Sequence, residues 1–233
     1  MENIIESKKL IDASKNIYLI TSEEPEAIAS TLALFYTLKD LGKNVNLILD
    51  ELPENLKFLS PSLDFISYPK NFVLSVPNSV AKISQIYYEK NDEALKIHLT
   101  LENGNIKKDN ISFYFQEAKP DLIITLGVED YQKELSERLN SFGFLLGSPI
   151  INIDNKQNNE NFGKINLLGN SSIAEITYNL SENLKKESAK CLLTGIVIYT
   201  ENFKNKLTAD IFEIAGNLMK AGADLKQITD NIK

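Results

Sequence analysis

Two rare residue types limit the side-chain chemistry of the sequence. The 233 residues include one histidine, His98, and one cysteine, Cys191. A Ser-His-Asp triad or a Cys-His pair would have to use His98, and a zinc site built from several His or Cys ligands is excluded. A metal site would therefore consist almost entirely of carboxylates, which favours Mg, Ca or Mn over Zn. A single cysteine also excludes an internal disulfide and is typical of a reducing cytoplasm.

Neither rare residue is predicted to be reactive. His98 lies in the alternating run Leu95–Leu101, where it shares the polar face with Lys96 and Thr100, so we interpret it as an exposed strand residue. Cys191 lies in an apolar helical stretch and is interpreted as a buried small hydrophobic residue.

Composition and charge indicate a soluble globular protein. Hydrophobic residues make up 43% of the chain and charged residues 24%, as in ordinary globular domains. A formal net charge of −7 makes nucleic-acid binding unfavourable, because the phosphate backbone is itself negative. No apolar run reaches the length of a membrane span, and residues 1–16 have the pattern of an amphipathic helix rather than a signal peptide. We therefore expect a cytoplasmic protein without a membrane partner.

The elements that must position any site alternate between strand and helix. Asn16–Ile20 is an apolar run typical of a buried strand, and Pro25 begins a helical pattern that ends at Gly42. Val45–Leu49 is the next strand, which completes a strand-helix-strand unit of a parallel sheet. Further strands are predicted at Asp121–Leu126 and Pro149–Ile153. A helix is expected to begin at Ile173, with Ser172 and Glu175 as its capping box. The other predicted helices lie near Glu129–Asn140, over Ala189–Ile198, after Thr208 and after Asp224. This pattern predicts an α/β fold with a Rossmann-like, largely parallel sheet flanked by helices.

The middle of the chain has a different pattern. Four strand-like runs are separated by turn residues, at Phe72–Val76, Ile83–Glu89, Leu95–Leu101 and Ile111–Phe115. Asn91-Asp92 and Asn103-Gly104 are turn signals, and the second is the stronger hairpin signal. We expect a single α/β domain over residues 1–233, with an antiparallel β-meander inserted at about 70–116.

Four segments resemble the motifs of the Asp-His-His phosphoesterases. Ile151–Leu180, INIDNKQNNENFGKINLLGNSSIAEITYNL, resembles the third motif, in which Asp-His-His precedes Asn, Phe-Gly, Asn-Leu and Ser-Ser-x-Ala-Glu. Ala189–Phe203, AKCLLTGIVIYTENF, resembles the fourth motif, in which Gly-Ile leads into Asp-Thr-Gly. Ile20–Leu34 is similar to the first motif and Asp121–Gly127 to the second. The branch that the chain resembles most is the oligoribonuclease and phosphoadenosine-phosphate phosphatase type.

This resemblance implies a two-metal hydrolase, usually with Mn, that cleaves phosphoester bonds of small nucleotides or single strands. It also implies a C-terminal substrate domain with a Gly-rich, His-containing loop, and the sequence up to Lys233 contains no such loop. We expect either that this domain has been lost or that the chain is a fragment.

The positions that match the metal ligands of the family carry altered residues. They are Glu24, Glu26, Gly127, Asp154, Asn155, Lys156 and Tyr199. Only Asp154 keeps its residue type, and Asn155 and Lys156 replace both histidines of the third motif. If a metal binds at all, the resemblance leaves Glu24, Glu26 and Asp154 as its ligands and Mn or Mg as the ion. The Lys156 ammonium would oppose a divalent cation electrostatically, so we expect no metal cofactor and no catalysis.

Lys156 also supports a structural hypothesis. Its ammonium could be neutralised by Glu24, Glu26 or Asp154, which would make the former metal site an internal salt-bridge cluster. A simpler alternative for the two glutamates is that acidic residues suit a helix N-terminus, where the helix dipole favours negative charge. Tyr199 is interpreted as filling space that a metal would otherwise occupy.

Three functions remain open, and the sequence favours the first. The first is a catalytically inactive, phosphoesterase-like protein that binds a protein partner or a second copy of itself through the inserted β segment. The aromatic residues of this segment are typical of interfaces, although they also suit a half-buried sheet face. They are Tyr87, Tyr88, Phe113, Tyr114 and Phe115.

The two alternatives use the carboxyl ends of the parallel strands. One is a nucleotide-binding protein without hydrolytic activity, in which side chains of the third and fourth motifs face a phosphate. These side chains are Asn155, Lys156, Asn158 and Lys204. The other is a Mn-dependent phosphoesterase that acts on small nucleotides or short oligonucleotides through Glu24, Glu26 and Asp154.

Overall fold

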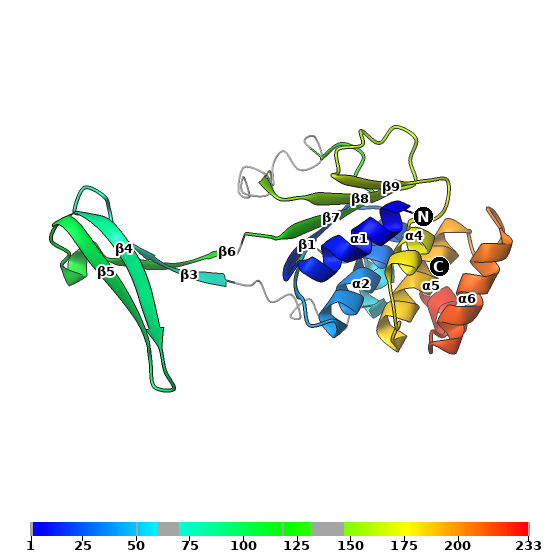
Figure 1. Cartoon of the computed structure of the whole chain (residues 1–233). Helices are drawn as coiled ribbons and strands as arrows, with labels where there is room; N and C mark the ends of the chain where they lie inside the picture. Colours follow the sequence, from blue (N-terminus) through cyan, green and yellow to red (C-terminus); the bar gives the residue numbers. More distant parts are fainter. Residues whose placement is uncertain (1, 50, 60–69, 118, 132–146, 233) are drawn as a thin grey trace. The chain divides into compact units, whose positions relative to one another are not determined.

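The computed structural model describes residues 2–49, 51–59, 70–117, 119–131 and 147–232 (Figure 1). The chain divides into two compact units, Met1–Pro69 with Lys119–Lys233, and Lys70–Ala118. The second unit covers the segment in which the β-rich insertion was expected, about 70–116.

The first unit is built on a parallel sheet, which confirms the predicted α/β class. Within the described residues the sheet has five strands in the order β2-β1-β7-β8-β9, and every neighbouring pair is parallel. The strands are β1 (Asn16–Thr21), β2 (Asn44–Ile48), β7 (Leu122–Leu126), β8 (Ile150–Asp154) and β9 (Ile165–Leu168). Because the chain runs from β1 outward to β2 and then returns to β7, the strand order reverses between β1 and β7. In such sheets the carboxyl ends of the strands at this reversal form the usual ligand-binding crevice.

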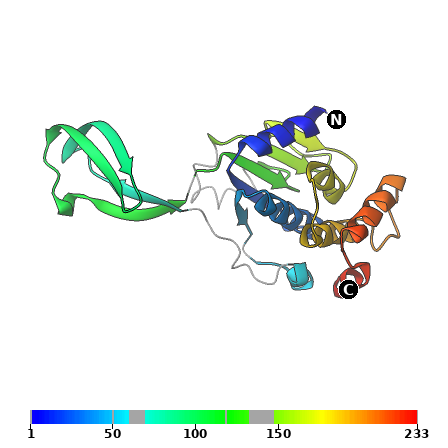
Figure 2. The same ribbon diagram turned by 60° about the horizontal axis from the view of Figure 1, so that its bottom comes forward.

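Helices cover one face of the sheet and bury most of its core. The helices are α1 (Glu2–Ala13), α2 (Pro25–Asp40), α4 (Ile173–Leu180), α5 (Lys186–Tyr199), α6 (Ala209–Lys220) and α7 (Leu225–Asn231), with a short 3₁₀ helix, η1 (Glu54–Leu59). Helix α2 packs against β1, β2 and β7, and helices α4 and α5 pack against α2 (Figures 1 and 2). A smaller apolar cluster contains strand side chains that alternate with those of the main core, together with two residues that follow β7. The strand residues are Tyr18, Ile20, Ile123 and Ile150, and the other two are Val128 and Tyr131.

Helix ends follow the capping chemistry predicted from the sequence. Pro25 is the first residue of α2, and Gly42, with φ of +73°, follows its end. Ser172 Oγ accepts a hydrogen bond from the Glu175 backbone N–H at 2.9 Å, and Thr208 caps α6 in the same way. The predicted helix near Glu129–Asn140 lies largely outside the described residues.

The second unit consists of two antiparallel strand pairs, so the predicted meander order is wrong. Strand β3 (Lys70–Ser75) pairs with β6 (Ser112–Glu117), and β4 (Ala81–Lys90) pairs with β5 (Leu95–Gly104). The first and last strands are therefore partners, and the β4-β5 hairpin is nested between them. In a meander each strand would have paired with its neighbour in sequence.

The stronger of the two turn signals does not form the hairpin turn. The reversal between β4 and β5 lies at Asn91–Ala94, where Asn91 Oδ1 accepts hydrogen bonds from the backbone N–H groups of Glu93 and Ala94. Gly104, with φ of +87°, instead ends β5 beside Ala81. A Cβ there would lie 2.3 Å from the Val80 carbonyl oxygen, so this glycine serves a close backbone approach rather than a tight turn.

Two elements of the first unit were not predicted. Strand β9 has only four residues, and η1 follows β2 without a distinct helical pattern. Within the described ranges, none of the helices combines the length and the apolar character needed to cross a bilayer.

Gly127 ends β7 in a backbone conformation that side chains rarely adopt. Its φ is +70°, and a Cβ would lie 2.7 Å from Ser22 Oγ and 2.8 Å from Ala27 Cβ. The carboxyl end of β7 is thus packed tightly against the loop after β1 and against α2. Because this is the position that matches an Asp of the family motif, the packing also leaves no room for a carboxylate.

The first prediction compares two glycines with similar φ. Gly127→Ala should destabilise the protein by about 2–4 kcal/mol, because backbone strain adds to a steric overlap. Gly42→Ala has a similar φ but no atom within 4 Å of the added Cβ, and should cost only about 1 kcal/mol. Urea unfolding followed by the helical circular dichroism signal measures both. Equal losses would show that the close approach at Gly127 is unimportant.

Candidate functional site

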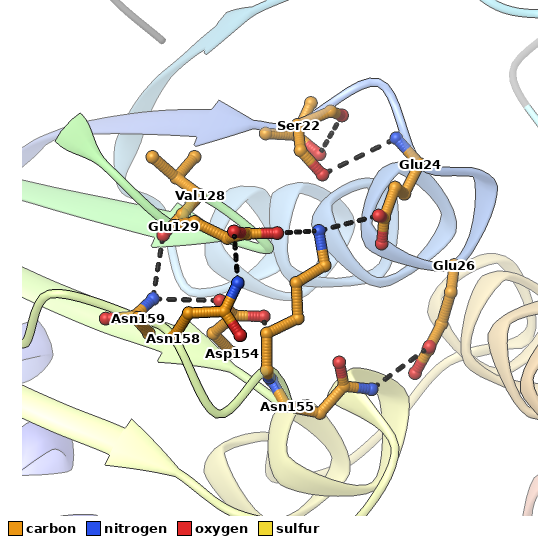
Figure 3. A network of polar contacts seen from close by, with 11 residues as sticks. Ser22, Glu24, Glu26, Val128, Glu129, Asp154, Asn155, Asn158 and Asn159 are labelled. Atoms are coloured by element: carbon orange, nitrogen blue, oxygen red, sulfur yellow. Dashed lines mark hydrogen bonds and ion pairs between the residues drawn. The ribbon is translucent and has the colours of Figure 1, made fainter. Parts of the chain in front are cut away.

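The carboxyl ends of β1, β7 and β8 bring together a polar cluster (Figure 3). Glu24 follows β1, Glu129 follows β7, and Asp154 is the last residue of β8. Asn155 and Lys156 come directly after it. Because adjacent parallel strands end at the same edge of the sheet, these residues meet although they are far apart in sequence.

Lys156 forms the centre of this cluster. Its ammonium lies 2.6 Å from Glu24 Oε1 and 2.7 Å from Glu129 Oε1, and its side chain is 27% exposed. Asn158 donates a hydrogen bond of 3.2 Å to the other carboxylate oxygen of Glu129. Burial alone would lower the pKa of the lysine, but the hydrogen bonds with Glu129 and Glu24 outweigh it and hold the pKa above its ordinary value.

Asp154 has its hydrogen bonds satisfied within the protein. Its carboxylate is fully buried, and Oδ1 accepts from the backbone N–H groups of Asn155 at 2.8 Å and Lys156 at 3.3 Å. Oδ2 accepts from the Asn159 side-chain amide at 2.8 Å. The residue therefore acts as an anchor that fixes the turn after β8, so its local role is structural.

A chain of buried amides extends this anchor beneath the sheet edge. Asn159 also donates to the Val128 carbonyl oxygen at 2.8 Å and accepts from Asn152 at 2.6 Å. Asn152 in turn accepts from Thr125 at 3.1 Å and donates to Asn166 at 3.2 Å. The network therefore joins the ends of β7, β8 and β9, and it fixes the loop that carries Lys156.

Glu26 is not an ion-pair partner of Lys156, and its carboxylate instead contacts the start of helix α4. Its carboxylate accepts from the Ile173 backbone N–H at 2.5 Å, at the start of α4, and from the Asn155 side-chain amide at 3.3 Å. Burial raises the pKa of Glu26 to about 7, although the hydrogen bonds from Ile173, Ala174 and Asn155 act in the opposite direction. The carboxyl group thus connects helix α2 to the N-terminus of α4.

Tyr199 and the loop after it form the remaining part of the region. Its hydroxyl donates to the Asn170 carbonyl oxygen at 2.9 Å, and the Lys206 ammonium lies 4.3 Å from the centre of its ring. Burial, with the nearby negative charges of Glu26 and Glu175, raises the pKa of Tyr199. After Thr200, the three residues Glu201–Phe203 all have φ between 51° and 60°, a left-handed turn without glycine.

The structure brings together only part of the set predicted from the sequence. Glu24 contacts Lys156 as proposed, whereas Glu26 and Asp154 are not its ion-pair partners, because each is held by backbone or amide N–H groups. Glu129 was missed. The signal that could have found it is its position just after a buried strand, which places it at the same sheet edge.

The residues present do not fit a two-metal centre. In the part of the chain that the structure describes, no group of three or more His, Cys, Asp or Glu side chains is arranged to hold an ion. An ammonium already lies between the two carboxylates that face each other across the strand ends, and both oxygens of Asp154 accept protein hydrogen bonds. Gly127 leaves no space for a further carboxylate.

A cavity of about 580 Å³ lies beside this cluster, beyond the ends of β1 and β2. Its floor is apolar and its rim is predominantly acidic. The lining residues are Thr21, Glu23, Ile28, Leu49, Glu51, Leu52, Pro53, Glu54 and Lys57. The single lysine of this lining is already paired with Glu54, so the cavity offers little attraction to a phosphate.

The two rare residues lie outside the cluster. His98 is on β5 in the second unit, where its ring stacks on Tyr87 with centroids 4.4 Å apart. Cys191 is fully buried in α5, as expected, and burial raises the pKa of its thiol.

Comparison with known proteins supports the fold. No protein-family profile and no curated protein matches the sequence. Among solved structures, an exopolyphosphatase-related protein from Bacteroides fragilis superposes with a TM-score of 0.68 at 19% sequence identity. The match covers 99% of this chain and 60% of that one. The chain therefore shares the α/β fold of that protein, and at this identity the likeness extends to the fold alone.

Removal of the central ammonium gives the second prediction. Lys156→Met should lower the free energy of unfolding by about 1–2 kcal/mol at neutral pH, because the carboxylates of Glu24 and Glu129 would then face each other without the ammonium between them. Lys57→Met, which breaks the exposed pair with Glu54, is the matched control and should have no measurable effect. Adding Glu24→Gln and Glu129→Gln to the first variant should recover part of the loss. An unchanged thermal melt of Lys156→Met would contradict the proposed role of the cluster.

The third prediction concerns the pH dependence of stability. Because the Glu26 pKa is about 7 in the folded protein and near 4.5 when unfolded, the folded state binds the proton more tightly. The stabilisation is complete below about pH 4.5 and is lost as the pH rises through 7. Relative to Glu26→Gln, the wild type should therefore lose about 2 kcal/mol between pH 5 and pH 8. Urea unfolding at several pH values tests this, and parallel curves for the two proteins would refute it.

Proposed function

We propose that this protein is a non-catalytic relative of phosphoesterases that acts by binding a protein partner, a second copy of itself included. The observation that carries the proposal is the Lys156 ammonium, held by Glu24 and Glu129 at the strand ends. This is the place in the fold where a phosphoesterase would need a dense positive charge from metal ions. A lysine supplies one charge, which its two carboxylates already neutralise.

Three further contacts argue against hydrolysis at this edge of the sheet. A divalent ion close to Lys156 would be repelled by the ammonium at short range. Asp154, the one residue that keeps the type found in the family motif, uses both carboxylate oxygens to accept protein hydrogen bonds. Gly127 is held too tightly for any side chain, so the lost carboxylate cannot be replaced from β7.

The charge of the cluster also argues against nucleotide binding. The amides proposed as phosphate donors are already engaged, since Asn155 donates to Glu26 and Asn158 donates to Glu129. Around Lys156 the carboxylates of Glu24 and Glu129 outnumber the ammonium, and a phosphate would be repelled. A protein-binding role makes no demand on this edge of the sheet, where the polar cluster serves to stabilise the fold.

The fourth prediction tests catalysis directly. With Mn or Mg, the full chain should hydrolyse neither a short oligoribonucleotide nor phosphoadenosine phosphate faster than its Asp154→Ala variant does. Turnover that requires Mn and is abolished by Asp154→Ala would overturn the proposal. A thermal-shift panel with the same nucleotides should show no stabilisation at millimolar concentration. A shift that disappears in Lys156→Met would favour the nucleotide-binding alternative instead.

A further inference from the structure

The β4-β5 hairpin gathers most of its apolar side chains on one face, which also carries Lys90 opposite Leu95. Pairs that face each other in the register, such as Ile86 with Leu99 and Tyr88 with Ile97, lie on the same side. A bulge between Ile83 and Gln85 keeps Ile83 on that side as well. We call this side the apolar face of the hairpin, and its residues are Ile83, Ile86, Tyr88, Leu95, Ile97, Leu99 and Leu101.

The opposite side of the hairpin is polar. It presents Gln85 with Thr100 and Glu89 with Lys96 as facing pairs. Its one aromatic residue, Tyr87, is stacked on its partner His98 with the two rings 2° from parallel. An alternation this regular is typical of a sheet with one face in water and the other against a partner.

No described side chain of the second unit covers the outer part of the apolar face. Four of its side chains are more than half exposed: Ile86 69%, Tyr88 73%, Leu95 61% and Ile97 51%. Among the described side chains of this unit, Ala81 is the only one that is buried. A two-stranded hairpin with a bare apolar face is marginally stable in water, so the unit needs a surface to pack against.

We propose that the apolar face of the hairpin is a self-association surface, and that its partner is the same face of a second copy of this chain. The inference rests on the proposed function, for which it names the partner. Two flat hairpins stacked face to face would form a small β-sandwich about 10 Å thick, related by a two-fold axis.

The exposed area is sufficient for such a contact. The four exposed side chains present roughly 500 Å² together, so a symmetric pair would remove about 1,000 Å² from water, which is the lower end of specific interfaces. Packing of the half-buried Leu99 and of the hairpin backbone would add to this area. The contact would be predominantly apolar, as in the cores of homodimer interfaces.

The distribution of charge also favours a second copy. The second unit, Lys70–Ala118, contains six lysines and six acidic residues, so it carries no net charge, whereas the whole chain carries −7. Two copies can therefore approach through this unit without the repulsion that the rest of the chain would produce. A neutral surface also has no preferred attraction for a strongly charged partner, such as an anionic membrane or a nucleic acid.

The fifth prediction compares the effects of two neighbouring substitutions, one on each face of the hairpin, on dimer formation. Light scattering after size exclusion and sedimentation velocity over a concentration series should show a dimer for the full chain. Ile86→Lys places a charge in the centre of the apolar face and should raise the dimer dissociation constant by about tenfold or more. Gln85→Lys adds the same charge one residue away, on the polar face, and should leave the dissociation constant unchanged. The helical circular dichroism signal checks that both variants remain folded.

Chemical cross-linking tests the geometry independently of affinity. Because Cys191 is fully buried, a cysteine introduced on the hairpin is selectively accessible to reagents. A bismaleimide that spans about 10 Å, the separation of stacked sheets, should join two copies through Ile97→Cys but not through the adjacent Lys96→Cys.

Several outcomes would overturn the self-association proposal. A strict monomer at all concentrations would do so, as would a dimer that Ile86→Lys does not weaken or cross-linking that is equal at both positions. A monomer that binds neutral lipid vesicles through this face would assign the surface to a membrane instead. None of these results would bear on the proposed absence of catalysis. Conversely, Mn-dependent turnover in a dimer would refute the non-catalytic proposal and leave the self-association proposal intact.

Discussion

Strands that end at the same edge of a parallel sheet force the polar residues after them into one small, partly dry volume. Charges placed there are partly removed from water and are stabilised by partners, although the Glu24 side chain is still 49% exposed. In this protein, Asp154 is satisfied by N–H groups and the Lys156 ammonium by Glu24 and Glu129. The arrangement of the loops after β1, β7 and β8 depends on this compensation, since each loop supplies one member of the set. The buried amide chain through Asn159 and Asn152 extends it to β9.

Because each charge at the strand ends is stabilised by a partner, an internal ion pair and a metal centre exclude each other there. A metal centre leaves charged ligands unpaired until the ion arrives, whereas an internal ion pair satisfies them permanently. Lys156 provides the second solution, and the protein gains order at the strand ends at the expense of an open coordination site. The proposed partner contacts would then use other surfaces, such as the exposed apolar side chains of the hairpin.

Local sequence features predicted the α/β scaffold because its strands are continuous apolar runs and its helices have strong caps, as at Pro25 and Ser172. They also placed Lys156 at a strand end. The position of Glu129 after a buried strand indicates the sheet edge, but its pairing with Lys156 depends on β7 lying beside β8, which is a property of strand order. The pairing of β3 with β6 escaped prediction for the same reason, since turn signals report only on neighbours in sequence. Strand β9 is too short for its pattern to stand out.

The insertion between β2 and β7 has a consequence for synthesis on the ribosome. The centre of the sheet forms when Ile17 in β1 pairs with Leu122 in β7, and all of Lys70–Ala118 is made before β7 emerges. Loop-closure entropy grows only logarithmically, so the insertion costs little stability, but it delays this pairing. For that interval β1 has an unpaired edge and an uncovered apolar surface while the amphipathic hairpin is already present. Nascent chains are therefore exposed to association with one another until β7 has emerged from the ribosome and can pair with β1.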